Sequence, residues 1–341
     1  MPIASDNYIE YCAEIAQSHD GSLGYVLSII DSLAKRNVDT VKFQLHLPEY
    51  ESTKSEDFRI PMSGQDNSRF EYWARTSFKK SEWVTIKQKC EDLSINFLCT
   101  PFSPQAIEIL EEIGTQRYKI ASADLANIQL LDEVLKTNKP IILSTGMSNF
   151  GEVQECVDYL GDSLEILLHC VSQYPLDENN VGFTRMSNFI SQYPNLKIGY
   201  SDHTGKARVA NWAIALGAKF IEQHVVYSRE QYGPDSSSSI ELDAIPQVIE
   251  FKNFGFSGSK FEADSELPQS NKTIKTLFGR GIAPVRDIKK GDVITLADIT
   301  MKKPTGPLSW QDRNLVVGKV ASVDLSKYQH LSLEQLEEDS E

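Results

Sequence analysis

The sequence lacks the marks of membrane and secreted proteins. It has no run of about 18 apolar residues, so no membrane-spanning helix is expected. Its first residues, MPIASDNYIEY, contain no basic stretch followed by an apolar one, as a secretory signal would. The five cysteines are odd in number, scattered and without a CxxC pair, so they offer no disulfide framework. We therefore expect a cytoplasmic, reduced protein with no membrane partner.

Positive charge is also scarce in this chain. Lysine and arginine number 34 against 48 aspartates and glutamates, which gives a formal net charge of −14 at pH 7. A chain of this charge repels phosphate backbones, so nucleic acid is not an expected partner. A small anionic ligand is still compatible, because a few lysines in one cleft set a local field that the net charge does not report.

Short apolar or β-branched runs alternate with longer amphipathic segments along most of the chain. The helix-like segments include residues 104–113 and 206–217. Eight strand–helix pairs within about 250 residues predict a (β/α)8 TIM barrel. An open doubly wound sheet would normally carry a glycine-rich turn after its first strand, and AEIAQSHDGS is not GxGxxG. The strand-like runs are 9–15, 41–45, 95–100, 118–122, 141–145, 164–170, 197–201 and 220–226.

Two polar segments interrupt this alternation. Residues 46–80, with two prolines and Gly64, are too long for an ordinary strand–helix loop and predict a covering loop after the second strand. Residues 254–275 predict a linker, after which short runs are broken by Gly, Pro and Asp turns. We expect the barrel over 1–255, the linker over 256–275 and a small β-rich domain over 276–336.

Polar residues occupy the ends of all the predicted strands, which a purely structural barrel does not need. In a TIM barrel these ends face the active site. Two lysines with several hydroxyls suit a compact ligand that carries carboxylate and phosphate, and two histidines on neighbouring strands suit a divalent metal. These residues are Glu14, Lys42, Gln44, Thr100, Lys119, Ser122, Asp124, Ser144, Ser172, Tyr174, Ser201, Asp202, His203 and His224.

Four carboxylates are candidates for acid–base work or for binding hydroxyls: Glu14, Asp124, Asp202 and Asp235.

Other polar and aromatic residues have simpler interpretations. His169 lies in an apolar run and is interpreted as structural, whereas His19 and His46 lie in loops and receive no role. The tryptophans Trp73, Trp83 and Trp212 are expected to pack in the interior, and cysteines in strand-like runs are expected to be small buried apolar residues.

Several strings, in this order, resemble the N-acetylneuraminate (sialic acid) synthase family and its nonulosonic acid relatives. PVRDIKKGDVIT (284–295) and VGKVASVDL (317–325) are similar to the C-terminal SAF, or antifreeze-like, domain of that family. The strings in the barrel are AEIAQSHDGS (13–22), VKFQLH (41–46), CTPFS (99–103), YKIAS (118–122), LSTGMS (143–148), HCVSQYP (169–175), GYSDHT (199–204), IEQHVV (221–226) and GPD (233–235).

The resemblance implies a reaction and a set of roles. Members of the family condense phosphoenolpyruvate with an open-chain (N-acyl)amino-sugar aldehyde, with C–O cleavage, to give a nonulosonic 2-keto acid and phosphate. His203 and His224 would bind Mn²⁺ or Mg²⁺. The phosphoenolpyruvate residues would be Lys42, Thr100, Lys119, Ser122, Ser144, Ser172 and Ser201. The residues around the sugar and the reacting atoms would be Glu14, Gln44, Asp124, Tyr174 and Asp235.

The resemblance also implies a domain-swapped homodimer in which the SAF domain supplies a basic side chain, here Lys303, to the partner's sugar site. The chain departs from the family pattern at four positions. Asp124 stands where the family has a glutamate, and Ser172 lies in SQYP, where an asparagine-containing string is more usual. Ser236 stands in place of a histidine, and Lys303 in place of an arginine. Since lysine cannot make the planar two-pronged contact of arginine, and all four positions touch the sugar or its surroundings, we expect an acceptor other than N-acetylmannosamine.

Three alternatives remain open at this stage. One is the same chemistry on a phosphorylated aldose, as in the 3-deoxy-octulosonate 8-phosphate and heptulosonate synthases, although these generally lack the C-terminal domain. A Schiff-base aldolase would use Lys119 as its nucleophile. A non-catalytic carbohydrate- or ice-binding protein would act through the C-terminal domain, which the many charges over 276–335 disfavour.

Overall fold

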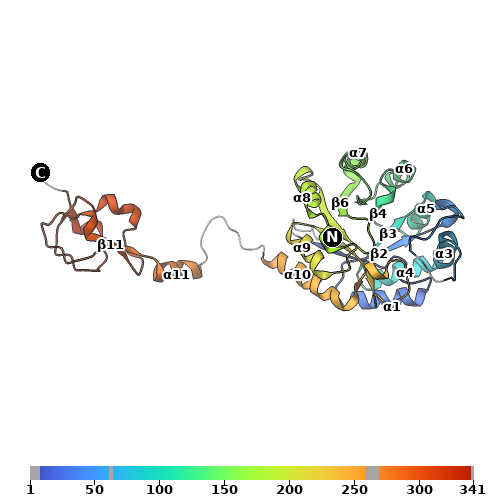
Figure 1. Cartoon of the computed structure of the whole chain (residues 1–341), viewed down its shortest axis with the longest axis horizontal. Helices are drawn as coiled ribbons and strands as arrows, with labels where there is room; N and C mark the ends of the chain where they lie inside the picture. The colour runs from blue at the N-terminus through green and yellow to red at the C-terminus, as the bar shows by residue number, and fades with distance from the viewer. Residues whose placement is uncertain (1–7, 61–63, 259–268, 339–341) are drawn as a thin grey trace. The chain divides into compact units, whose positions relative to one another are not determined.

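The chain forms two compact units, residues 1–260 and 261–341 (Figure 1). The structure is a computed structural model and describes residues 8–60, 64–258 and 269–338. None of the helices in these ranges is both long and apolar enough to cross a membrane.

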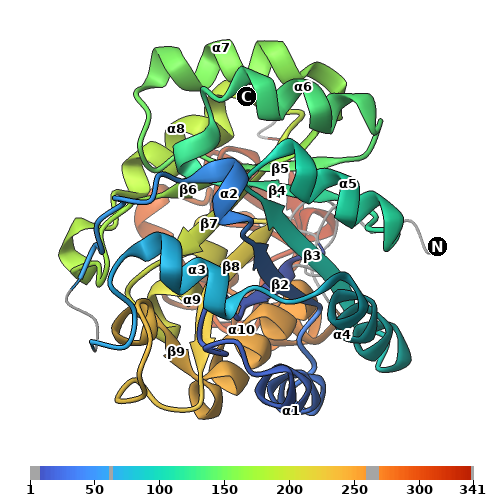
Figure 2. The same ribbon diagram turned by 90° about the vertical axis from the view of Figure 1, so that its right-hand side faces the viewer.

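The first unit is a closed barrel of eight parallel strands, as the sequence predicted. Each strand pairs with the next, and β8 pairs back with β1 to close the ring (Figure 2). The register sets Glu14, at the end of β1, opposite Lys42 on one side and His224 on the other. The strands are β1 (Glu10–Glu14), β2 (Thr40–Leu45), β3 (Asn96–Pro101), β4 (Tyr118–Ile120), β5 (Ile141–Ser144), β6 (Leu164–Cys170), β7 (Lys197–Asp202) and β8 (Phe220–Val226).

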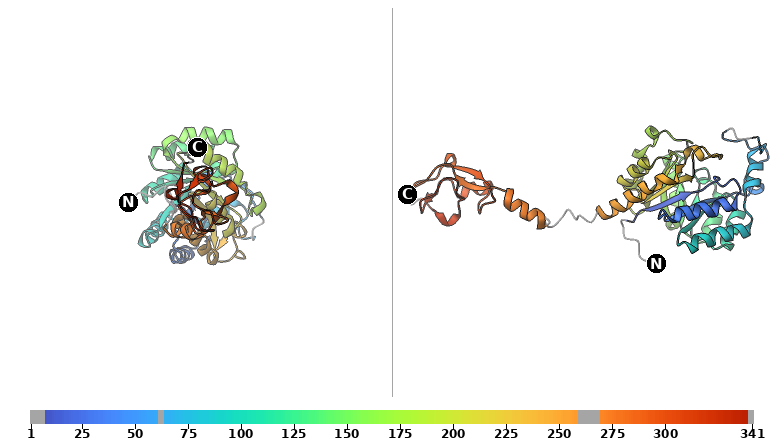
Figure 3. Two further views of the ribbon diagram at one scale, coloured as in Figure 1. Left: turned by 90° about the vertical axis from the view of Figure 1, so that its left-hand side faces the viewer. Right: turned by 90° about the horizontal axis from the view of Figure 1, so that it is seen from below.

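Helices form the outer layer of this unit and bury one apolar face each against the strands (Figures 2 and 3). Several begin at a residue whose side chain accepts a backbone N–H of the first turn, such as Ser103 before α5 and Asn149 before α7. The helices are α1 (Leu23–Ala34), α4 (Lys80–Asp92), α5 (Pro104–Glu112), α6 (Ile128–Lys136), α7 (Phe150–Leu160), α8 (Phe183–Gln192), α9 (Ala207–Ala215) and α10 (Ile245–Gly258).

The tryptophan expectation is right for two residues and wrong for one. Trp73 and Trp83 are buried, but Trp212 is 63% exposed. The buried stripe of α9 runs through Val209, Ala210 and Ala213, which turns Trp212 to the flank of the helix. All five cysteines are buried and free, in line with the sequence interpretation.

The segment 46–80 contains more structure than the predicted covering loop. It forms α2 (Pro48–Glu51) and α3 (Arg69–Thr76). The guanidinium of Arg75 holds the segment together, because it bonds to Asp66 within the segment and to Asp20 after β1. Figure 2 shows α2 and α3 lying over the barrel strands.

The second unit is small and β-rich, as expected. Strand β10 (Gly281–Pro284) pairs antiparallel with β11 (Ile299–Lys302), and β12 (Val320–Ala321) with β13 (Leu336–Glu337). A separate apolar core that includes Ile282 supports them. Part of the predicted linker over 256–275 is helical, since it holds the end of α10 and much of α11 (Gln269–Phe278), and its residues 259–268 lie outside the described residues.

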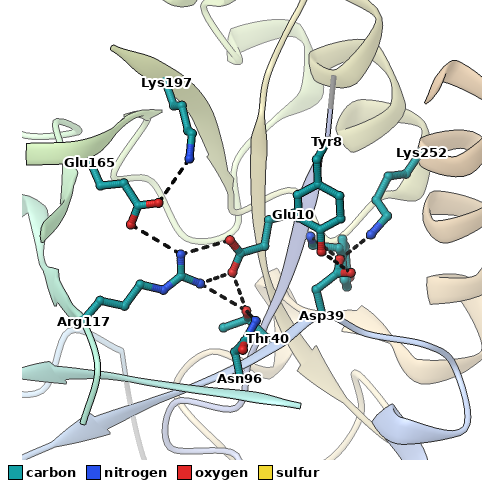
Figure 4. A network of polar contacts seen from close by, with 10 residues as sticks. Tyr8, Glu10, Asp39, Thr40, Asn96, Arg117, Glu165, Lys197 and Lys252 are labelled. Atoms are coloured by element: carbon teal, nitrogen blue, oxygen red, sulfur yellow. Dashed lines mark hydrogen bonds and ion pairs between the residues drawn. The ribbon is translucent and has the colours of Figure 1, made fainter. Parts of the chain in front are cut away.

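A polar network closes the amino-terminal end of the barrel (Figure 4). Arg117, just before β4, bonds to Glu10 at the start of β1 and to Thr40 at the start of β2. Its second amino group lies 3.6 Å from Glu165 at the start of β6. The Arg117 and Glu10 side chains are only 14% and 12% exposed. Because this end of a TIM barrel does not carry the active site, we interpret the network as structural.

Arg117→Met is expected to lower the free energy of unfolding of the barrel by about 3 kcal/mol, because it leaves a nearly buried Glu10 carboxylate without its cation. Equilibrium urea unfolding measures the change. Lys197→Met is the matched control, because Lys197 is 54% exposed in its pair with Glu165 and such pairs contribute less than about 1 kcal/mol. Equal losses for both variants would contradict a stabilising role for the network.

Candidate active site

A cavity of about 310 Å³ lies at the carboxyl-terminal end of the barrel strands. Residues from β1 to β8 line it, and Phe58, Arg59, Tyr72 and Trp73 from the covering segment form part of its wall. The volume falls within the range of small-molecule sites. Among the residues named from the sequence, those that line the cavity are Glu14, Lys42, Gln44, Thr100, Lys119, Ser122, Ser144, Ser172, Tyr174, Ser201, His203, His224 and Asp235.

Two lysines and two glutamates form the charged floor of the cavity. Lys42 Nζ makes an ion pair with Glu14, lies 3.8 Å from Glu222 and donates to Thr100 Oγ1 at 3.4 Å. Lys119 Nζ donates to Ser144 Oγ at 2.7 Å and lies 3.9 Å from Glu222. All four charged side chains are at most 6% exposed. Buried ammonium groups beside hydroxyls suit an anionic ligand.

The ionisation of Glu222 follows from its neighbours. Burial alone would raise the pKa of its carboxyl, but Lys119 and Lys42 outweigh burial and lower it. Ser201 Oγ adds a hydrogen bond to Glu222 Oε1 at 3.0 Å. Glu222 is therefore a carboxylate that balances the two ammonium groups.

A cradle of hydroxyls surrounds Gly146, after β5. The backbone N–H of Gly146 donates to Ser122 Oγ at 2.9 Å. A Cβ at this glycine would lie 2.5 Å from Ser172 Oγ and 3.1 Å from Ser122 Oγ, so a larger residue would fill the cradle. Ser172 Oγ is buried and has no hydrogen-bond partner among the described residues. An unpaired buried hydroxyl in a cradle of this kind is suited to an oxyanion ligand.

His203 and His224 stand side by side, one directly after β7 and the other in β8. Their ring centroids are 5.5 Å apart, and the Tyr174 ring lies 3.9 Å from that of His203. Burial lowers the pKa of His224 to about 4, so its imidazole is neutral near pH 7, as a metal ligand must be. Its Nδ1 is buried and has no partner among the described residues.

The described residues contain no group of three or more His, Cys, Asp and Glu that would hold a metal ion by themselves. The two imidazoles fit a cation whose other positions belong to substrate and water. This arrangement is typical of a catalytic metal site, which keeps open positions, and differs from a closed structural site.

The covering segment reaches the far side of the cavity through Arg59. Its Nη2 donates to Asp235 Oδ1 at 2.6 Å and to the Pro234 carbonyl at 2.8 Å. The guanidinium carbon also lies 4.1 Å from the centroid of the Tyr174 ring. Arg59 thereby joins the covering segment to two residues that the sequence placed around the sugar.

Three candidate site residues do not line this cavity. Asp202 is one of them, because its carboxylate accepts hydrogen bonds from Thr204 and Gln223. The side chain of Asp124 accepts a hydrogen bond from Asn127 at 2.9 Å, and burial raises the pKa of its carboxyl. Lys303 belongs to the second unit, where its ammonium group lies 5.1 Å from the centroid of the Phe278 ring.

Glu222, Arg59 and His46 line the cavity and received no role from the sequence. Glu222 stands one residue after the apolar start of IEQHVV, and a glutamate within an apolar strand is a usable signal for an inward charge. Arg59 and His46 lie in the segment 46–80, where spacing alone gives no orientation.

Comparison with known proteins gives consistent matches over both units. A model of the NeuB family matches residues 29–253, and a SAF domain model matches residues 279–337. The N,N'-diacetyllegionaminic acid synthase of Campylobacter jejuni is 30% identical over 91% of this chain and 95% of its own length. The pseudaminic acid synthase of Helicobacter pylori is 26% identical over 95% of this chain and 97% of its own length.

Comparison with solved structures agrees with these sequence matches. The crystal structure of the N-acetylneuraminic acid synthetase of Leptospira borgpetersenii, in complex with citrate, superposes with a TM-score of 0.69 and 28% identity. The alignment covers 79% of this chain and 90% of that one. The matched relatives are thus synthases of sialic, legionaminic and pseudaminic acids, which are nonulosonic acids.

Proposed function

The chain belongs to the NeuB family, and on that basis we propose that it condenses phosphoenolpyruvate with the open-chain aldehyde of an amino sugar or its N-acyl derivative. The products are a nonulosonic 2-keto acid and phosphate. The observation that carries the proposal is the pairing of two buried lysines with the hydroxyl cradle on one cavity. This combination provides for a carboxylate and a phosphate a few ångströms apart.

The polar groups divide between the two ends of phosphoenolpyruvate. Lys42, Thr100 and Lys119 hold its carboxylate and neighbouring oxygens, and Ser144 and Ser201 stand beside them. Ser122, Ser172 and the N–H of Gly146 receive the phosphate. When phosphoenolpyruvate binds, its carboxylate takes over part of the pairing that Glu14 and Glu222 provide. The two ammonium groups therefore keep an anionic partner throughout binding.

The bond changes follow from the substrates. C3 of phosphoenolpyruvate bonds to the aldehyde carbon, and the aldehyde oxygen takes up a proton to become a hydroxyl. Water adds at C2 and gives up one proton, which balances the proton taken up by the aldehyde oxygen. The C2–O bond to phosphate then breaks, and the C2 hydroxyl passes its remaining proton to the departing phosphate to leave the ketone. His203 and His224 would hold Mn²⁺ or Mg²⁺, which when bound polarises the aldehyde.

The remaining side chains act on the acceptor and on its protons. Glu14 is our candidate for moving a proton, because one of its oxygens faces Lys42 and the other accepts from the N–H of Ala16 at 2.7 Å. Burial raises the pKa of Tyr174, so its hydroxyl keeps its proton and acts as a hydrogen-bond donor. Gln44 and Asp235 bind hydroxyls of the sugar. The lysine at position 303, where the family has an arginine, favours an acceptor other than N-acetylmannosamine.

The direct test is phosphate release from phosphoenolpyruvate with Mn²⁺ or Mg²⁺ and a panel of acceptors. The panel contains free hexosamines, their N-acyl derivatives, deoxy-diamino hexoses and phosphorylated aldoses. Turnover with a free amino sugar supports the proposal, and turnover confined to phosphorylated aldoses would replace it with the rival reaction. Borohydride trapping at Lys119 with pyruvate would instead indicate a Schiff-base aldolase.

We also propose a cytoplasmic homodimer in which the SAF unit of one chain completes the acceptor site of the other. Five free cysteines suit a reducing compartment. The dimer is supported by α11, on which Ile274, Leu277 and Phe278 are more than half exposed. Three exposed apolar residues within one helical turn and a half are typical of a surface that another element covers.

Leu277→Glu is expected to convert a dimer into a monomer, because it places a charge at the centre of the apolar face of α11. Light scattering coupled to gel filtration measures the mass of each form. Asn271→Glu, an exposed position on the same helix one turn and a half away, is the charge control and should leave the mass unchanged. A wild-type monomer at micromolar concentration would contradict the dimer.

Lys303→Ala is expected to raise KM for the acceptor by about tenfold while KM for phosphoenolpyruvate changes by less than about twofold. The reason is that Lys303 would contact the acceptor alone. Steady-state kinetics with each substrate varied in turn measures the two constants. Lys302→Ala is the neighbouring control, since Lys302 lies 4.1 Å from the Tyr328 ring within its own unit. Equal changes in both constants would remove Lys303 from the acceptor site.

A further inference from the structure

His46, which received no role from the sequence, is the most tightly held ring at the cavity wall. Its imidazole lies parallel to two aromatic rings, with Trp73 at 3.9 Å and 5° on one face and Phe102 at 4.2 Å and 10° on the other. The side chain is only 6% exposed. Two stacked faces fix the plane of the ring, so its two nitrogens can point in only one pair of directions.

Each ring nitrogen meets an oxygen. Nδ1 lies 2.9 Å from Glu51 Oε1, and Nε2 lies 3.2 Å from Gln44 Oε1. The Glu51 side chain is 8% exposed, so its carboxylate depends on this partner. The imidazole therefore connects the Glu51 carboxylate to the Gln44 amide.

The contact with His46 fixes the orientation of the Gln44 amide. One end of the amide meets the His46 ring, and Gln44 lines the cavity, so the other end is left for a ligand. A held amide presents one hydrogen-bonding group to the ligand, whereas a freely turning amide presents either of two.

We infer that Glu51, His46 and Gln44 form a positioning relay that holds the Gln44 amide toward a hydroxyl of the acceptor sugar. The inference rests on the proposed function, because it takes Gln44 as an acceptor-side residue. Glu51 ends α2, so the relay also ties the covering segment to β2. His46 acts through Gln44 and is a positioning residue.

His46→Phe tests the relay, because phenylalanine keeps a ring between Trp73 and Phe102 and removes both hydrogen bonds. We expect KM for the acceptor to rise at least about tenfold and KM for phosphoenolpyruvate to change by less than about twofold. In a Gln44→Leu background, the same change should add less than about twofold, because the residue it positions is gone. Additive losses, or equal losses for both substrates, would overturn the inference.

A second measurement works without any substrate. Gln44→Leu identifies the side-chain amide of Gln44 in ¹H–¹⁵N spectra, and His46→Phe and Glu51→Gln should shift or broaden its two peaks. Glu49→Gln is the matched control, because Glu49 is an exposed residue of the same helix. Glu51→Gln retains the size of the side chain, so it provides the measurement if His46→Phe fails to fold. Unchanged Gln44 peaks in Glu51→Gln would overturn the relay. Failure of every acceptor to turn over in the wild type would refute the proposed function, whereas these spectra would still report on the relay.

Discussion

Replacing His203 or His224 with alanine is expected to lower turnover at least about 1000-fold without unfolding the barrel. The protein contributes two imidazoles to the proposed cation site, so either change removes one of its two protein ligands. Phosphate release measures turnover, and calorimetric titration with Mn²⁺ measures binding of the ion directly. Circular dichroism checks that each variant is folded.

The matched control for this prediction is His169→Gln. His169 is equally buried, but its Nε2 meets the Val181 carbonyl at 2.7 Å and the residue does not line the cavity. This variant should bind Mn²⁺ like the wild type, even if its stability falls. Full activity and unchanged Mn²⁺ binding in both His203→Ala and His224→Ala would refute the metal assignment.

Lys42→Met is expected to lower kcat/KM for phosphoenolpyruvate by about 1000-fold, which corresponds to roughly 4 kcal/mol. The variant removes one of the two ammonium groups and leaves Glu14 facing the substrate anion without its cation. Steady-state kinetics and calorimetric binding of phosphoenolpyruvate measure the loss. Lys252→Met is the control, because Lys252 is a comparably buried lysine, paired with Asp39 in the network at the other end of the barrel. Similar losses of affinity in both variants would indicate a general effect of removing a buried lysine.

The same residue gives a pH dependence. Burial lowers the pKa of Lys42, with Glu222 opposing the shift and Lys119 reinforcing it. Binding of phosphoenolpyruvate requires the ammonium form, so affinity should fall as pH rises through this lowered pKa. The fall should therefore begin at a lower pH than for an ordinary lysine, and Lys42→Met should lack this limb of the profile.

The sequence predicted the barrel well because strand periodicity and strand-end polarity are local signals. Each predicted strand overlaps an observed one, and parallel closure then brings the polar ends to one mouth. The residue that a side chain contacts from an irregular segment cannot be predicted from the local sequence pattern. Arg59 meets Asp235 across 176 positions of sequence, and no spacing rule connects them.

Two other differences have distinct physical causes. Trp212 shares an apolar pattern with Val209, but the stripe of α9 that faces the strands is narrower than that pattern. Asp124 follows β4 at the expected point, yet a short helical turn at residues 122–124 places it beside Asn127. Both cases depend on a rotation of the backbone by a fraction of a turn, which residue types alone do not fix.

The cavity is assembled from two kinds of parts, and this division has a practical consequence. The groups assigned to phosphoenolpyruvate come from the barrel strands or the turns that follow them, whereas Arg59, Tyr72, Trp73 and the Glu51–His46 contact belong to one continuous stretch of sequence. Because that stretch is continuous in sequence, one exchange of residues 46–80 replaces every contact that it makes at the cavity. Under the proposed function, a chimera that keeps the barrel strands should change KM for the acceptor and leave KM for phosphoenolpyruvate within about twofold.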